Sequence, residues 1–331
     1  MYEQILESAR RIAGAIHHTP ILTSTHLDQL TNNSLFLKCE NFQRMGAVKF
    51  RGAYNAISLL SEEQRKKGVI AYSSGNHAQA VSLVGKIFDI PTTVVMPCDV
   101  PEVKLKAAKG YNAKVVLYDR RTDDRQKIAR DLAEQNGFTL IPPYNDRNVI
   151  CGQGTVAKEI IDEIKDLDYL LTPCGGGSLL SGCAIYIKKV LPKCKIIGVE
   201  PELADDAARS FKSGSIQGVE NSETIADGLR TPCLGDITFD YIKEYVDDML
   251  TVTEEEILES MYYLWSRQKI VVEPSGAVAL APVLFGKLQK LYKNSPTEDM
   301  KNKKIGIVIS GGNVDVRQVG EFFKNIKQEN L

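Results

Sequence analysis

The sequence has almost no net charge and no long hydrophobic segment. Its 41 Lys and Arg residues nearly balance 42 Asp and Glu residues, leaving a net charge of −1, which argues against nucleic-acid partners and anionic membrane surfaces. The longest apolar run, residues 276–286, is too short to cross a bilayer. The N-terminus starts with a helical pattern and lacks the features of a signal peptide. We therefore expect a cytoplasmic protein that binds neither nucleic acid nor membrane.

Paired cysteine motifs are also absent. The seven cysteines are scattered and form no C-x-x-C pair, which argues for reduced thiols and against a disulfide framework or a zinc site. What the chain does have is 331 residues, of which 43% are apolar and 25% are charged. That length and composition suit two ordinary globular domains.

Short apolar strands alternate with helical patterns along most of the chain. The predicted strands are residues 35–37, 69–72, 92–96, 114–118, 169–172, 195–199 and 304–309. Strands this apolar, separated by helices, are typical of parallel sheets that are covered on both faces. Capping boxes at residues 61–64 and 253–256 predict two helix starts.

Two breaks divide the chain. Residues 66–68 form a charged turn, and residues 142–148 form a loop rich in proline and asparagine. Because three strand–helix units lie between them, we predict a small α/β domain at 68–147 inserted in a larger domain made of 1–67 and 148–331. The cleft between two such domains is a favoured place for a ligand.

One lysine stands between a predicted strand and a predicted helix. Lys49 is flanked by Val48 and Phe50. Apolar surroundings lower the pKa of a lysine and leave more free amine, which can form a Schiff base with an aldehyde. The simpler alternative is a lysine whose stem packs on Phe50 while its head stays in water. Taken alone, this stretch favours that alternative.

Polar stretches follow or precede other predicted elements. The Ser-Ser-Gly-Asn-His stretch at 73–77 follows a strand and offers hydroxyls, an amide and free backbone N–H groups, which suit a carboxylate or a ring oxygen. The Ser-Gly-Gly-Asn stretch at 310–313 follows the last strand, and Glu-Pro-Ser-Gly at 273–276 precedes an apolar helix. Each is equally well explained as a helix cap or a glycine turn.

Three consecutive glycines follow the strand at 169–172. Glycine N–H groups at a helix start suit a phosphate, but no Walker motif is present. The stretch nearly fits the dinucleotide pattern, although Leu180 stands where a third glycine is wanted, and Glu200 could hold a ribose. An NAD-dependent dehydrogenase is therefore one alternative, and a plain tight turn is another.

Carboxylates follow the predicted strand at 195–199. Glu200, Asp205 and Asp206 lie close together in the sequence. With a main-chain carbonyl, such carboxylates suit a hard cation such as Mg²⁺ or Ca²⁺. The alternative is that the two aspartates only favour a helix N-terminus.

Taken in this order, these stretches resemble the pyridoxal-phosphate enzymes of fold type II, and among them the serine racemase and short serine/threonine dehydratase group. The resemblance runs from the first predicted helix to Asn313. It implies a tryptophan synthase β-like α/β fold with two open, mainly parallel, twisted sheets flanked by helices. It also implies pyridoxal 5′-phosphate, a divalent cation (Mg²⁺, Ca²⁺ or Mn²⁺), an amino-acid substrate and a homodimer, and it leaves room for a nucleotide effector.

The resemblance implies roles for individual residues. Lys49 would form the Schiff base and act as a base, and Ser74 would be the acid–base group on the other face of the cofactor. The cofactor would also contact Asn76, Gly175, Gly176, Gly177, Ser178, Leu179 and Ser310. The substrate would contact Ser73, Ser74, Asn76, His77 and Arg125, and the metal would contact Glu200, the Ala204 carbonyl and Asp206. Three departures from the family are Val48, where phenylalanine is usual, Ser178, which replaces a fourth glycine, and Tyr144, which stands where some racemases carry a substrate-side asparagine.

The implied activity is β-elimination from serine or threonine, which yields a 2-oxo acid and ammonia. Serine racemisation is implied as a further or alternative main activity, and threo-3-hydroxyaspartate ammonia-lyase as another alternative. Two different classes compete with these: the dehydrogenase, and a binding protein for a small ligand without turnover.

Overall fold

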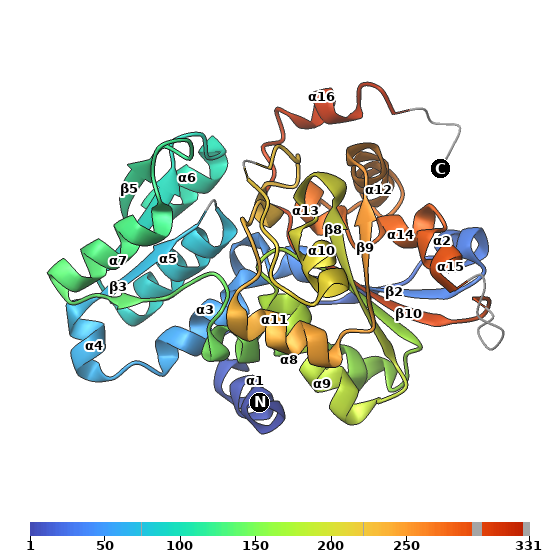
Figure 1. Ribbon diagram of the computed structural model, residues 1–331, viewed down its shortest axis with the longest axis horizontal. Coiled ribbons are helices and arrows are strands. Elements are labelled where there is room, and N and C mark those ends of the chain that lie inside the picture. Colours follow the sequence, from blue (N-terminus) through green and yellow to red (C-terminus); the bar gives the residue numbers. More distant parts are fainter. Residues whose placement is uncertain (74, 221, 293–299, 327–331) are drawn as a thin grey trace.

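The computed structural model describes residues 1–73, 75–220, 222–292 and 300–326, which form two mainly parallel sheets flanked by helices (Figure 1). The larger sheet has six strands in the order β1-β2-β10-β7-β8-β9, and the smaller has four in the order β5-β4-β3-β6. Within the described chain, only β1 pairs antiparallel to its neighbour. The predicted fold class is therefore confirmed.

All seven predicted strands are present. The larger sheet consists of β1 (Ile21–Leu22), β2 (Ser34–Cys39), β7 (Tyr169–Pro173), β8 (Lys195–Pro201), β9 (Asp248–Val252) and β10 (Lys304–Ile309). The smaller sheet consists of β3 (Val69–Tyr72), β4 (Thr92–Pro97), β5 (Lys114–Tyr118) and β6 (Thr139–Leu140). Strands β1, β6 and β9 were not predicted; β1 and β6 have two residues each, too few to give a hydrophobic pattern.

The helices cover both faces of the sheets. In chain order they are α1 (Tyr2–Ile12), α2 (Thr25–Thr31), α3 (Lys49–Ser58), α4 (Glu62–Lys67), α5 (Asn76–Phe88), α6 (Glu102–Gly110), α7 (Arg125–Asn136), α8 (Arg147–Ile164), α9 (Ser178–Val190), α10 (Asp206–Ser213), α11 (Asp236–Tyr245), α12 (Glu254–Ser266), α13 (Pro274–Ala277), α14 (Ala281–Leu284), α15 (Lys287–Tyr292) and α16 (Val319–Phe323). Both predicted capping boxes form, at the starts of α4 and α12. No helix of the described chain is long and apolar enough to cross a membrane.

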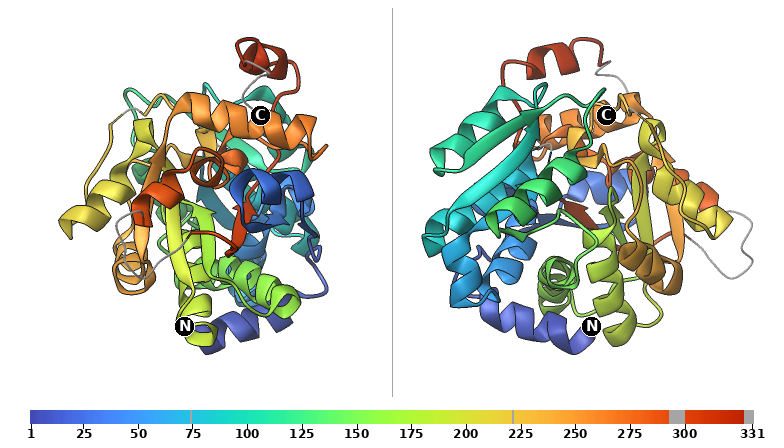
Figure 2. Two further views of the ribbon diagram at one scale, coloured as in Figure 1. Left: turned by 90° about the vertical axis from the view of Figure 1, so that its right-hand side faces the viewer. Right: turned by 60° about the vertical axis from the view of Figure 1, so that its left-hand side comes forward.

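Apolar residues on both faces of the larger sheet build two cores. One core joins the sheet to α2 and to the helices α12 to α15, and the other joins it to α1, α8, α9 and α11. Figure 2 shows α1, in dark blue, at the bottom of the molecule beneath the green helices of the second core. Every residue of β3, β4 and β7 is buried, which explains their continuous apolar sequences.

A buried ion network holds the start of α3 in place. The Arg51 guanidinium donates to both carboxylate oxygens of Glu40, at 2.7 and 2.8 Å, and to both of Glu159, at 2.6 and 2.8 Å. The Lys38 ammonium lies 2.7 Å from Glu159 Oε2. These contacts join α3, two residues from Lys49, to the end of β2 and to α8, and so hold the backbone that carries Lys49.

Candidate active site

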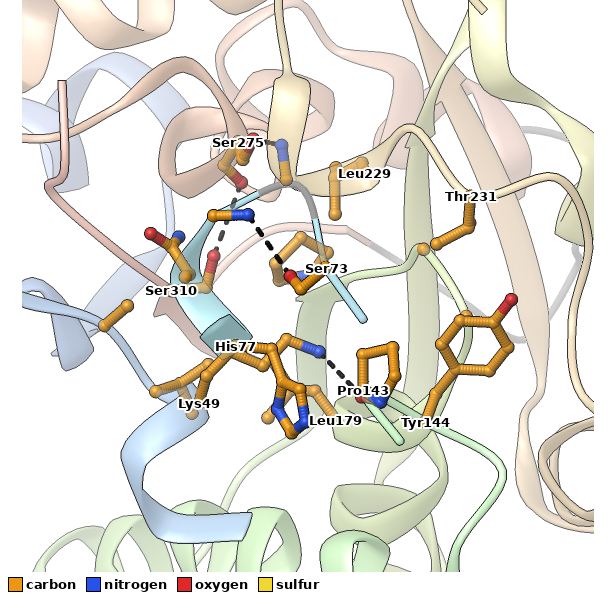
Figure 3. A pocket seen from close by; sticks show the side chains of 18 of the residues that line it. Lys49, Ser73, His77, Pro143, Tyr144, Leu179, Leu229, Thr231, Ser275 and Ser310 are labelled. Atoms are coloured by element: carbon orange, nitrogen blue, oxygen red, sulfur yellow. Dashed lines mark hydrogen bonds between the residues drawn. The ribbon is translucent and has the colours of Figure 1, made fainter. Parts of the chain in front are cut away.

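A pocket lies between the two sheets, at the carboxyl ends of strands from both (Figure 3). The end of β3 contributes Ser73 and His77, the end of β7 contributes the glycine loop, and the end of β10 contributes Ser310. Predicted site residues that line the pocket are Lys49, Ser73, Asn76, His77, Arg125, Gly175, Gly176, Gly177, Ser178, Leu179 and Ser310. The fold thus gathers stretches that are far apart in the sequence into one site, as expected for the carboxyl ends of parallel strands.

Lys49 is the first residue of α3 and points into this pocket (Figure 3). Its Nζ donates to the carbonyl oxygen of Pro143 at 3.1 Å. Burial lowers the pKa of Lys49 to about 8, against an ordinary value of 10.5. Roughly a quarter of such a lysine is a free amine at pH 7.5, against about a thousandth for an ordinary one. The predicted lowering of the pKa is confirmed.

The start of α5 offers N–H groups to a ligand. Asn76 and His77 open this helix, and the first N–H groups of a helix have no partner within it. The His77 ring donates from Nε2 to the Ile141 carbonyl oxygen at 2.9 Å, and burial lowers the pKa of His77 to about 3. The ring is therefore neutral, with a bare Nδ1 that cannot donate to a carboxylate. His77 can reach a substrate carboxylate through its backbone N–H. Ser74, the predicted second acid–base group, lies outside the described residues.

A buried charged cluster in the pocket was not predicted from the sequence. Lys104 on α6 donates to both carboxylate oxygens of Asp227, at 2.9 and 2.6 Å, and to Glu273 Oε2 at 3.0 Å. The other oxygen of Glu273 accepts from Asn76 Nδ2 at 2.5 Å. Asn313 Nδ2 donates to Asn76 Oδ1 at 3.0 Å, so the side-chain amide of Asn76 is held from both ends. Glu273 does not cap α13 with its side chain; its carboxylate belongs to the pocket.

The three glycines lead into α9 and shape a cradle for an anion. Gly177 has a φ of +89°, a conformation that favours glycine. A Cβ added at Gly176 would overlap the ring of Tyr144, so this position also requires glycine. Thr238 Oγ1 donates to the Gly176 carbonyl oxygen at 2.8 Å and holds the loop. Together with the free N–H groups at the start of α9, the loop suits a phosphate group.

Two further predicted residues lie on opposite sides of the pocket. Ser310 Oγ donates to the Ser275 carbonyl oxygen at 3.4 Å, a long bond that leaves the hydroxyl able to turn toward a ligand. Arg125 begins α7 and lies with its guanidinium carbon 5.8 Å from the centroid of the Tyr72 ring. Its charge therefore faces the pocket from the side of the smaller sheet.

The two carboxylates among the predicted metal ligands, Glu200 and Asp206, lie close to each other and to Cys174, the residue before the glycine loop. The Glu200 carboxylate accepts from the backbone N–H groups of Ala207 and Ala208, at 3.3 and 2.8 Å. Both carboxylate oxygens of Asp206 are buried without a hydrogen-bond partner. Burial raises the pKa of Asp206 to about 7, and burial together with Asp206 raises that of Glu200 well above its usual range. Buried carboxylates without partners are costly, and a hard cation would relieve that cost.

The described residues contain no cluster of three or more His, Cys, Asp or Glu side chains that could hold a metal. Glu200, the carbonyl of Ala204 and Asp206 would be a different ligand set, with two carboxylates and one backbone oxygen. Such a set suits Mg²⁺, Ca²⁺ or Mn²⁺, which prefer oxygen.

Comparison with known families decides the class of the protein. Residues 12–311 match the family described as "Pyridoxal-phosphate dependent enzyme". The chain belongs to this family. The pocket fits the cofactor of these pyridoxal-phosphate enzymes, because it combines a lysine with a lowered pKa and a glycine cradle for a phosphate. Membership of this family excludes the two competing predictions, an NAD-dependent dehydrogenase and a binding protein without turnover.

Individual pyridoxal-phosphate enzymes are similar over nearly the whole chain. The sequence is 48% identical to "L-threo-3-hydroxyaspartate ammonia-lyase" of Saccharomyces cerevisiae, covering 96% of this chain and 94% of that protein. It is 47% identical to "Serine racemase" of Schizosaccharomyces pombe, covering 97% and 96%. The solved structure of maize serine racemase superposes with a TM-score of 0.90 at 38% identity, covering 98% and 96%. The chain is therefore an enzyme of the ammonia-lyase and racemase type.

Proposed function

We propose that this enzyme removes the β-hydroxyl group of a hydroxy amino acid such as serine or threonine, giving a 2-oxo acid and ammonia, with serine racemisation as a second activity. The observation that carries the proposal is the position of Lys49. Its amine has a lowered pKa and lies in a pocket that also contains two helix N-termini, those of α5 and α9. Such a pocket suits an amino-acid carboxylate and a phosphate side by side.

We propose the following contacts for pyridoxal 5′-phosphate. Lys49 would hold the cofactor covalently, and the backbone N–H groups from Gly175 to Leu179 would bind its phosphate. Ser310 would face the ring nitrogen, and Asn76 would face the ring oxygen. When bound, the cofactor supplies an electron sink that acidifies the Cα–H bond of an amino acid.

The protein's own groups would position the substrate and move its protons. The substrate carboxylate would bind the Ser73 hydroxyl and the free N–H groups of Asn76 and His77. Lys49 would take the Cα proton on one face, since a base with a pKa near the working pH is the most effective. The β-hydroxyl then leaves as water, and water returns when the product is hydrolysed to the 2-oxo acid and ammonia.

Racemisation needs a second proton donor on the opposite face of the substrate. We propose Ser74 for this role, from its place in the Ser-Ser-Gly-Asn-His stretch. A proton returned by Lys49 restores the starting enantiomer, whereas a proton from Ser74 gives its mirror image. The ratio of racemisation to elimination would then depend on how the two residues share the proton transfer.

We also propose a divalent cation, Mg²⁺, Ca²⁺ or Mn²⁺, at Glu200, the Ala204 carbonyl and Asp206. The support is the pair of unpartnered oxygens on Asp206 and the raised pKa values of both carboxylates. This site follows β8, next to the strand that leads into the glycine loop, so a bound cation would stiffen the phosphate cradle from behind.

The cellular setting and assembly are proposals as well. We propose a cytoplasmic homodimer, and a nucleotide effector that binds it. All seven cysteines are free in the structure, which supports a reducing compartment. Light scattering of the purified enzyme should give the mass of a dimer. The enzyme activity should change when ATP is added, and an unchanged activity would contradict the proposed effector.

The experiment that tests the function combines a spectrum with two product assays. The purified enzyme should show a cofactor absorbance band that borohydride bleaches, and mass spectrometry should find the reduced cofactor on Lys49. L-serine should yield a 2-oxo acid and ammonia, and chiral chromatography should find D-serine. A cofactor attached to Lys49 with neither product would contradict the proposed reaction. Attachment to another lysine would contradict the site.

A further inference from the structure

Glu273 has no role in the proposed mechanism. It opens the Glu-Pro-Ser-Gly stretch, yet its side chain does not cap α13. The carboxylate is buried in the wall of the active pocket, where the residue is only 1% exposed. Because a buried carboxylate is costly unless it is paired and hydrogen-bonded, its place in this wall calls for an explanation.

Two glycines make room for Glu273 and for its partner Lys104. A Cβ added at Gly311 would overlap Glu273 Oε1, and a Cβ added at Gly75 would overlap the Lys104 stem at Cδ. These glycines belong to the Ser-Gly-Gly-Asn and Ser-Ser-Gly-Asn-His stretches. Three polar stretches from distant parts of the chain therefore meet around one buried ion pair.

The hydrogen bonds around Asn76 fix which way its amide points. Asn313 Nδ2 donates to the Met45 carbonyl oxygen at 2.8 Å and to Asn76 Oδ1 at 3.0 Å, which uses both of its hydrogens. Asn76 Nδ2 therefore faces Glu273, whose Oε1 accepts from it at 2.5 Å. Since an amide nitrogen carries two hydrogens, one N–H of Asn76 remains for the ring oxygen of the cofactor.

The cluster of Glu273, Asp227 and Lys104 carries a net charge of −1. The two carboxylates share the Lys104 ammonium, and the side chains of Lys104 and Glu273 are each 1% exposed. Burial raises the pKa of Glu273, but the charge of Lys104 opposes the rise, so the ion pair keeps the carboxylate ionised. Water and salt screen a buried charge of this kind much less than a charge at the surface.

Other titratable side chains face the pocket from several elements. Burial keeps three of them uncharged, through a lowered pKa for the first and raised pKa values for the other two: His77 on α5, Tyr144 and Cys174. In the described lining, Arg125 on α7 is the remaining charged side chain besides Lys49 and the cluster. The charge in hydrogen-bond contact with Asn76 is that of Glu273.

We propose that Glu273 is a positioning residue that acts on the cofactor through Asn76. Its carboxylate holds the amide with one N–H toward the ring oxygen, and its charge keeps the Schiff base formed at Lys49 protonated. Glu273 lies beside the larger sheet, whereas Asn76 and Lys104 lie on helices of the smaller one. The arrangement therefore exists only while the two sheets are docked. The inference rests on the proposed function, because it assumes a cofactor bound to Lys49.

The test follows the protonation of the Schiff base by absorbance. Its protonated and neutral forms absorb at different wavelengths, so a pH titration of the holoenzyme gives its pKa. Glu273→Gln removes the negative charge and leaves one oxygen for two donors, Asn76 and Lys104. The pKa of the Schiff base should fall by about one unit, since a nearby opposite charge favours the protonated form. Titration of the apoenzyme should show pyridoxal-phosphate binding weakened about 10-fold, the effect of one misplaced hydrogen bond.

Asp227→Asn is a second variant, which keeps the pair of Lys104 and Glu273. It removes one negative charge from the more exposed end of the same cluster, where the Asp227 side chain is 16% exposed. The pKa of the Schiff base should fall again, but by less than in Glu273→Gln. The affinity for pyridoxal phosphate should stay close to that of the wild type, because Asn76 keeps its partner.

Asp315→Asn is the matched control. The Asp315 side chain is 12% exposed and pairs with Arg317. It lines the outer cavity beside Lys104 and not the active pocket. The substitution removes the same charge as Glu273→Gln, and it should leave the pKa of the Schiff base and the cofactor affinity unchanged.

Three outcomes would overturn the inference. An unchanged pKa of the Schiff base in Glu273→Gln, with a lowered melting temperature, would make Glu273 a structural residue only. A higher pKa would contradict the sign of the charge effect, and an equal fall in Asp315→Asn would show a general effect of net charge. If Glu273→Gln does not fold, an unchanged pKa in Asp227→Asn overturns the inference in its place. Failure of the proposed function is distinct, because borohydride would then fix the cofactor of the wild-type enzyme on another lysine.

Discussion

Lys49 combines two tasks in one side chain. It would anchor the cofactor and also take the Cα proton of the substrate, because its amine is desolvated at the start of α3. We expect Lys49→Ala to abolish elimination and racemisation together, whereas Lys86→Ala, at an exposed position of α5, should keep both. Turnover of L-serine and chiral analysis of the product would measure this. Near-normal turnover by Lys49→Ala would contradict the assignment.

The lowered pKa of Lys49 also predicts a pH-dependent cost for folding of the cofactor-free protein. The pKa of Lys49 is about 8 in the folded chain and 10.5 in the unfolded chain. Between pH 8 and pH 10.5 the unfolded state binds more protons than the folded state, so the free energy of unfolding rises with pH. The loss of stability caused by burying this lysine is therefore largest below pH 8. Lys49→Met should therefore stabilise the apoprotein at pH 7, by up to about 3 kcal/mol, and the gain should vanish near pH 10.5. Urea unfolding of both proteins at the two pH values would measure it; a gain that does not depend on pH would contradict the shift.

At the level of single elements, the glycine loop between β7 and α9 tolerates little change. A methyl group at Gly176 would push against the Tyr144 ring, and overpacking of this kind costs about 1–3 kcal/mol. We expect Gly176→Ala to weaken pyridoxal-phosphate binding at least 10-fold, since the displaced loop carries the phosphate N–H groups. Titration of the apoenzyme by absorbance would show this. Gly110→Ala is the control, because no atom lies within 4 Å of its added Cβ.

The ion network around Arg51 predicts a large stability difference between a buried and an exposed pair. Arg51→Met would leave Glu40 and Glu159 buried with Lys38 as the remaining cation, and breaking a buried pair costs on the order of 3–5 kcal/mol. Lys158→Met removes an exposed pair with Asp162 in α8 and should cost less than about 1 kcal/mol. Equal unfolding free energies for the two variants, measured in urea, would show that the network contributes no more than a surface pair.

The elements also show what the sequence could predict. Strands β3, β5 and β10 match their predicted bounds, because each is a continuous apolar run bounded by turns. Helix α8 was missed since Gly152 and Gly154 weaken its pattern; the structure uses them for close contact with α3 and α9. Lys104 and Glu273 were not assigned to the site, as 169 residues separate them and only the fold brings them together.

For the whole molecule, a divalent cation at Glu200 and Asp206 should stabilise the larger sheet. Chelation should lower the melting temperature of the holoenzyme, and Mg²⁺ or Ca²⁺ should restore it. Asp206→Asn should remove the response to the metal, because it removes the charge that draws the cation, and should lessen the cost of burying two carboxylates. Differential scanning fluorimetry would follow both effects. A wild-type enzyme with little residual metal and no response to chelator would contradict the site.

We propose that residues 68–147 form a domain of their own, inserted in the larger one. The four strands of the smaller sheet lie within this range, and none of them pairs with the larger sheet. A fragment of residues 68–147 that folds cooperatively, as followed by circular dichroism, would support this boundary. A fragment that stays unfolded would show that the smaller sheet depends on contacts with α3 and α8.

The pairing of β3 with β6 has a mechanical consequence. Val69 lies opposite Thr139, and Ile70 opposite Leu140, so the chain enters and leaves the smaller sheet at neighbouring strands. We expect any rotation of the smaller sheet relative to the larger one to pivot at these two crossings. In Figure 1, α4, which leads into β3, lies at the bottom, and α6, which carries Lys104, lies at the top. Lys104 connects the side of the smaller sheet to that of the larger one through its ion pairs with Asp227 and Glu273. We expect these two ion pairs to break before the pocket between the sheets can open for the cofactor to leave, while the strand pairing within each sheet is kept.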